Sequence, residues 1–174
     1  GVLVKQESRR RGETFVTRKI TRGLSEISVG KSSTLTMGNL DSKRDWGHAK
    51  DYVEMMWLML QQEEPRDYVI STGQQYSVRD FIILSAEELG VELEFSGKGV
   101  DEVAIVTKVD KSISPAIKIG QKLIDVNKRY YRPAEVDNLL GDSSFAKKML
   151  GWEPRITLKM MIQEMMESEL RNLK

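Results

Sequence analysis

Apolar and polar residues along this chain recur with two periods, one typical of helices and the other typical of strands. Apolar positions at three- and four-residue intervals predict amphipathic helices, at residues 13–29, 48–62, 77–89, 144–150 and 157–170. Short apolar or alternating runs predict strands, at residues 2–4, 34–37, 68–71, 91–95, 103–106 and 122–126. The runs at 2–4 and 68–71 are predicted to be buried strands. Helices and short strands are interspersed, which predicts an α/β fold.

Local signals support several of the helix boundaries. Ser77 and Asp80 form a Ser-x-x-Asp pair like that of a capping box, and Thr157 is placed to cap the last helix. Gly30 and Gly90 each follow a predicted helix, where glycine commonly ends one.

The length and composition are those of one ordinary domain with a real core. The 174 residues are 40% apolar and 30% charged. No apolar run approaches the roughly 18 residues of a membrane span, and the run at residues 1–5 is too short for a signal peptide. The absence of cysteine excludes disulfides and fits a reducing cytoplasm. We therefore expect a single cytoplasmic domain without membrane contact.

Positive charge is concentrated in the first third of the chain. Residues 1–50 hold eleven Lys and Arg against five Asp and Glu, a net +6, so the remainder carries −5 of the overall +1. A basic first third indicates an anionic ligand, and a nucleotide diphosphate and a nucleic acid are both candidates.

The segment 38–54 combines a polar loop, basic residues and the start of a helix. Arg44 lies on the predicted loop just ahead of that helix. A guanidinium offers paired donors to phosphate oxygens, and a helix N-terminus adds free N–H groups. The segment therefore indicates an anion site, and the alternative interpretation is a surface pair of Arg44 with Asp45 beside a half-buried Trp46.

The motifs of several enzyme classes are missing from the sequence. No Gly-x-Gly-x-x-Gly follows a strand, and the nearest approach, at residues 97–99, lacks the third glycine. There is no Tyr-x-x-x-Lys pair, and a single histidine without cysteine disfavours a histidine triad or a zinc site. We therefore predict no catalytic residue and no metal ligand in this chain.

Four long segments resemble GDP-mannose 4,6-dehydratase, an extended short-chain dehydrogenase/reductase. They are RRGETFVTRKITR (10–22), GNLDSKRDWGHAKDYVEMMWLML (38–60), YYRPAEVDNLLGD (130–142) and AKKMLGWEPRITL (146–158). The resemblance covers essentially the whole chain but only the C-terminal half of such an enzyme. It implies late Rossmann strands interleaved with the small α/β domain that binds the nucleotide sugar, as one truncated unit over 1–174.

The resemblance implies a substrate site for GDP-mannose. Val16 and Lys19 match positions that line the GDP site, and Arg44 matches the arginine that holds the diphosphate. Arg132 and Glu135 match a pair in which the arginine suits the diphosphate or ribose and the carboxylate suits a guanine edge or a ribose hydroxyl. Considered locally, the same pair is typical of a solvated turn.

The implied contacts to the family's cofactor, NADP, fall on Gln6 and Arg11. The family's strand before Arg11 ends Asn-His-Glu-Ser-Pro, whereas residues 5–9 read Lys-Gln-Glu-Ser-Arg. Gln6 thus replaces a histidine that contacts the cofactor, which weakens the expectation that this chain alone binds NADP. Lys5 replaces an asparagine near the sugar nucleotide.

Residues 99–127 are interpreted as a β-hairpin insertion of the substrate domain, by its similarity to an insertion in the bacterial dehydratases. The stretch 117–127 also looks like the hairpin of a PDZ peptide-binding module, but the rest of that module is missing.

The resemblance implies a parent reaction that removes water from GDP-mannose with NADP as hydride carrier. Because the residues for that chemistry are absent, we predict a truncated homologue that retains the nucleotide-sugar portion and is inactive alone. Two alternatives stay open: a non-catalytic assembly or scaffold partner of a sugar-nucleotide enzyme, and a less favoured nucleic-acid-binding protein. Open strand edges predict association, as a homo-oligomer or with a complementary N-terminal half. The competing interpretation is a monomer in which residues 99–127 fold back and cap the open edge.

Overall fold

The computed structural model describes residues 1–131 and 138–173. Its helices are α1 (Val16–Ser28), α2 (Ala49–Leu60), α3 (Val78–Glu87), α4 (Ser144–Leu150) and α5 (Leu158–Leu173), with a 3-10 turn η1 (Gly99–Asp101). Its strands are β1 (Val2–Leu3), β2 (Lys5–Glu7), β3 (Leu35–Met37), β4 (Lys43–Arg44), β5 (Trp46–His48), β6 (Val69–Ile70), β7 (Tyr76–Ser77), β8 (Val91–Ser96), β9 (Val103–Val109), β10 (Lys122–Val126) and β11 (Asn138–Leu139).

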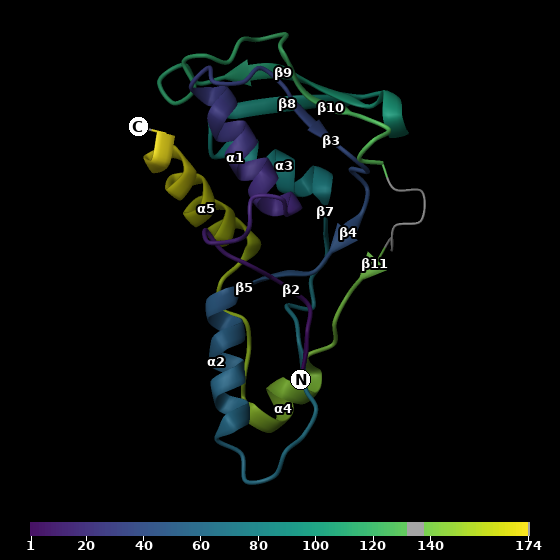
Figure 1. Ribbon diagram of the computed structural model, residues 1–174, viewed down its shortest axis with the longest axis vertical. Coiled ribbons are helices and arrows are strands. Elements are labelled where there is room, and N and C mark those ends of the chain that lie inside the picture. The colour runs from purple at the N-terminus through teal and green to yellow at the C-terminus, as the bar shows by residue number, and fades with distance from the viewer. Residues whose placement is uncertain (132–137, 174) are drawn as a thin grey trace.

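The upper lobe in Figure 1 is a four-stranded sheet packed against α1, α3 and α5. The strand order is β3-β10-β9-β8, with β10 parallel to β3 and antiparallel to β9. On α1, Ile20, Leu24 and Ile27 lie on one face and are fully buried, because their spacing aligns them along the helix. Arg18 Nε donates to Glu169 Oε1 at 2.8 Å and joins α1 to α5.

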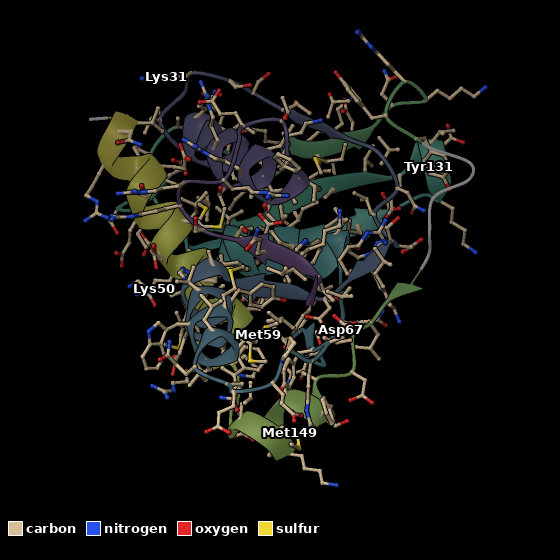
Figure 2. The ribbon with its side chains drawn as sticks, turned by 60° about the horizontal axis from the view of Figure 1, so that its bottom comes forward. Lys31, Lys50, Met59, Asp67, Tyr131 and Met149 are labelled. Atoms are coloured by element: carbon tan, nitrogen blue, oxygen red, sulfur yellow. The ribbon has the colours of Figure 1, made fainter. Side chains whose placement is uncertain are left out.

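The lower lobe is built around α2, α4 and the parallel pair β1–β6 (Figure 1). Figure 2 shows Met59 of α2 and Met149 of α4 at this end of the molecule. Its apolar core consists of Tyr52, Met55, Tyr68, Ile70, Ala146 and Trp152. The buried carboxylate of Asp51 accepts hydrogen bonds from the backbone N–H groups of Arg155 and Ile156, at 3.0 and 2.9 Å. These bonds fix α2 against the segment that leads into α5.

Two short sheets, one of two strands and one of three, connect the lobes. Strand β2 pairs with β5 in parallel, and β4 lies between β11 and β7. These strands contain only two or three residues each. The sequence prediction missed β2, β4, β5, β7 and β11, because a strand of two or three residues is too short to show a repeated alternation.

Strand β1 was predicted to be buried, and that prediction is wrong. Val2 is 62% exposed and Leu3 is 39% exposed. Their strand forms a ladder with β6, which buries backbone groups on one edge only. The apolar side chains of β1 are therefore partly open to solvent.

In the described part of the chain, no helix combines the length and the apolar character needed to cross a membrane. The same residues contain no group of three or more His, Cys, Asp or Glu side chains that would hold a metal ion.

Candidate functional site

A pocket of about 400 Å³ lies where α1 begins, between β2, the end of β3 and β4. The elements that meet here are found near the middle of Figure 1. Three cationic side chains, Lys5, Lys19 and Arg44, line the pocket together with the carboxylate of Glu7. The pocket therefore has the size and the charge of a site for a small anionic ligand.

Arg44 reaches this pocket from a strand and not from a loop. It lies in β4, is only 7% exposed, and its Nη1 donates to the Lys43 carbonyl at 2.7 Å. The alternative of a surface pair with Asp45 is wrong, because Asp45 is fully buried and accepts hydrogen bonds from Thr72 and Gly73. Trp46, expected to be half-buried, is also fully buried.

The N-terminus of α2 does not share this pocket with Arg44. Ala49 and Lys50, the first residues of α2, line a separate hollow with Arg9 and Arg10. The expectation that one anion would contact both Arg44 and the N–H groups of this helix is therefore not met by the geometry.

Val16 and Lys19 both line the pocket from the start of α1. They are three residues apart and so lie on the same face of the helix. The Lys19 ammonium lies over the ring of Tyr130, with Nζ 4.1 Å from the ring centroid. Burial lowers the pKa of Lys19 below its ordinary value. A half-buried ammonium without strong solvation gains more from an anionic partner than an exposed one does.

Glu7 places a buried carboxylate beside these cations. Its Oε2 accepts a hydrogen bond from the Thr17 hydroxyl at 2.7 Å and lies 3.2 Å from Arg11 Nε. Burial raises the pKa of Glu7, while the Thr17 hydrogen bond and the charge of Arg11 pull it in the other direction. Glu7 thus holds Arg11 at the edge of the site.

Strand β2 carries residues from both expected sets of contacts, those near the substrate and those near the cofactor. Side chains alternate along a strand, so Lys5 and Glu7 point to one face and Gln6 points to the other. Neither Gln6 nor Arg11 lines the pocket. The guanidinium of Arg11 stacks on Phe15, 3.5 Å from the ring centroid.

The structure thus brings Val16, Lys19 and Arg44 to one pocket, and Arg132 and Glu135 lie outside the described residues. The sequence interpretation did not single out Glu7 or Tyr130 as lining residues. The two-residue period from Lys5 to Glu7 was the available signal for the first. For Tyr130 the signal was its position directly before the Tyr-Arg-Pro segment.

Comparison with known proteins identifies the family. The family model described as GDP-mannose 4,6 dehydratase matches residues 1–165. The chain belongs to the GDP-mannose 4,6-dehydratase family. It is 63% identical over 170 residues to a GDP-mannose 4,6-dehydratase of Vibrio cholerae serotype O1, covering 98% of this chain and 46% of that relative. The human GDP-mannose 4,6 dehydratase is 44% identical, with 98% and 43% covered.

This GDP-mannose 4,6-dehydratase homologue spans a little under half the length of the relatives it matches. The prediction that it resembles a C-terminal half of the family is confirmed. Solved structures share its fold at low identity. RMD from Pseudomonas aeruginosa, complexed with NADPH, superposes with a TM-score of 0.74 and 17% identity over 98% of this chain and 47% of that one.

A UDP-glucose 4-epimerase from Thermotoga maritima, solved with UDP-glucose, gives a TM-score of 0.67 and 18% identity, covering 99% and 45% of the two chains. These neighbours confirm the predicted α/β fold, which is that of a part of an extended short-chain dehydrogenase.

Proposed function

We propose that the pocket binds the diphosphate of a nucleotide sugar and that, in this family, the ligand is GDP-mannose. The observation that carries the proposal is the convergence of Lys5, Lys19 and Arg44 from β2, α1 and β4 on one pocket. Among the described lining residues Glu7 is the single carboxylate, so the pocket favours an anion.

Each cation has a distinct role in the proposal. Arg44 supplies the paired donors of a guanidinium to two phosphate oxygens, and its burial makes the contact stronger than an exposed one. The ammonium groups of Lys5 and Lys19 neutralise the remaining phosphate charge. Val16 supplies apolar contact beside them, and Arg132 and Glu135 remain predicted contacts to the ribose or base.

We infer that this chain by itself binds NADP poorly. Arg11, the predicted cofactor contact, is already held by the Glu7 carboxylate and the Phe15 ring. A nucleotide cofactor in the family would supply hydride transfer. In our proposal this chain contributes the binding and orientation of the nucleotide sugar and not the cofactor site.

Calorimetric titration tests the proposed ligand class. We expect GDP to bind, NADP to bind more weakly and generic RNA to bind least. Because binding to RNA rests on phosphate neutralisation alone, its affinity falls steeply with salt, so the titrations are run at low and at physiological salt. A chain that prefers RNA to GDP at both salt concentrations would support the nucleic-acid alternative instead.

We expect no dehydratase activity from the chain by itself. The sequence has no Gly-rich dinucleotide motif and no Tyr-x-x-x-Lys pair to move the protons. The chain is incubated with GDP-mannose and NADP, and the 4-keto product is measured beside the longer Vibrio cholerae relative as a positive control. Turnover above background would contradict this part of the proposal.

An exposed apolar surface supports the predicted association of the chain. Val53, Trp57 and Leu60 recur along one face of α2 and are 59%, 59% and 81% exposed. The exposed side chains of β1 belong to the same lobe. Exposed apolar surface of this kind marks an interface, and we propose that a second copy of the chain covers it, with a complementary N-terminal half as the alternative occupant.

A further inference from the structure

Tyr130 forms a wall of the pocket without a role in the core. It lines the pocket with Phe15, and 47% of it is exposed. Its neighbour Tyr131 appears in Figure 2 on the side of the molecule away from α4. The ring of Tyr130 has two cationic neighbours, the Lys19 ammonium at 4.1 Å and the Arg129 guanidinium at 5.9 Å from the centroid. The ring of Tyr130 therefore makes cation–π contacts and does not pack in the apolar core.

Backbone hydrogen bonds hold the turn that carries this ring. The N–H of Asn127 donates to the Met37 carbonyl at 3.0 Å, which ties the turn to the end of β3. The N–H of Tyr130 donates to the Asn127 carbonyl at 2.9 Å, and the Asn127 side chain accepts from the N–H of Arg129. A β-carbon at Gly38 would overlap the carbonyl oxygen of Tyr130, so the turn packs directly on the backbone of the pocket.

Lys19 connects this ring to the proposed phosphate site. Its ammonium can interact with the ring or with a phosphate oxygen, and the charge-assisted bond to phosphate is the stronger of the two. A bound diphosphate would therefore draw Lys19 toward it and leave the ring face that the ammonium covers open to the ligand. A nucleobase is a flat π system, and every base can stack on an aromatic side chain.

We propose that Tyr130 is the platform on which the pocket stacks the base of its nucleoside diphosphate ligand. This inference rests on the proposed function, because it takes the diphosphate as held by Lys5, Lys19 and Arg44. Recognition is thereby divided between cations that hold the phosphates and a ring that distinguishes a nucleotide from a bare diphosphate.

The test compares GDP with inorganic pyrophosphate, which has the phosphates but no base. Affinities are measured by calorimetry for the wild type and for the variants Tyr130→Ala, Tyr130→Leu and Tyr130→Phe. Base–aromatic stacking contributes enough that its loss lowers affinity about fivefold or more. We expect this loss for GDP in the alanine and leucine variants, near wild-type GDP affinity in the phenylalanine variant, and unchanged pyrophosphate affinity in all three.

The leucine variant keeps apolar bulk at the site, and the half-exposed position of the side chain makes all three variants compatible with folding, which circular dichroism checks. Equal GDP affinity in the wild type and the alanine variant would overturn the proposal that the base stacks on Tyr130 and leave the proposed function intact. Equal losses for GDP and pyrophosphate would overturn it too, because the ring would then act through Lys19 alone. A wild type that binds neither GDP nor pyrophosphate would overturn both proposals.

Discussion

Arg44→Ala is expected to weaken GDP binding about tenfold or more. A hydrogen bond to a charged group is worth roughly 1.5–3 kcal/mol, and 1.4 kcal/mol corresponds to a factor of about ten in affinity. Arg44 is buried in β4, where a lost charge is not replaced by solvent contacts. Calorimetric titration of wild type and variant with GDP measures the effect.

Lys43→Ala is the matched control for Arg44→Ala. Lys43 is the neighbouring residue of β4, carries the same charge, is exposed and does not line the pocket. We expect the control variant to retain GDP affinity within about twofold, because exposed charges are screened by salt. Equal affinities of the wild type and Arg44→Ala, or equal losses in both variants, would contradict a specific phosphate contact by Arg44.

Light scattering at micromolar concentration is expected to give a mass close to twice the 19.9 kDa of one chain. Val53, Trp57 and Leu60 on one face of α2, and Val2 of β1, are each more than half exposed. A two-fold dimer buries the same patch from both copies. Trp57→Lys places a charge in the middle of this patch and is expected to give the mass of a monomer.

Met160→Lys is the control for the dimer prediction. Met160 is an exposed apolar residue of α5, in the other lobe, so its replacement is expected to leave the dimer mass unchanged. A wild-type mass near 19.9 kDa over the whole concentration range would reject the dimer. If the Trp57 variant is a monomer that still binds GDP, assembly and ligand binding are independent.

Most of the helices could be predicted from the sequence because each has a local signal. The five predicted helical segments correspond to α1 through α5. The capping box is confirmed, since the Ser77 side chain accepts from the N–H of Asp80 and the Asp80 carboxylate accepts from the N–H of Ser77. Gly30 and Gly90 adopt positive φ after α1 and α3, as the prediction of helix ends requires.

The site could be predicted only in part, because its geometry depends on contacts between distant segments. The charge and the motif at Arg44 indicated an anion site. Its position on a buried strand follows from pairing with β7 and β11, which no local pattern in residues 38–47 records. The platform at Tyr130 depends on a close backbone approach to Gly38, some ninety residues earlier in the chain. The extent of the domain and the interpretation of 99–127 as an insertion stay predictions.

The path of the chain between the lobes has a consequence for dissecting the protein. The chain starts in the lower lobe at β1, enters the upper lobe with α1 and β3, and returns with α2. It then moves up again for α3, down for α4 and finally up for α5 (Figure 1). Neither lobe is therefore a continuous piece of sequence. A single lobe cannot be produced by truncating the chain, because its segments would have to be joined by new linkers.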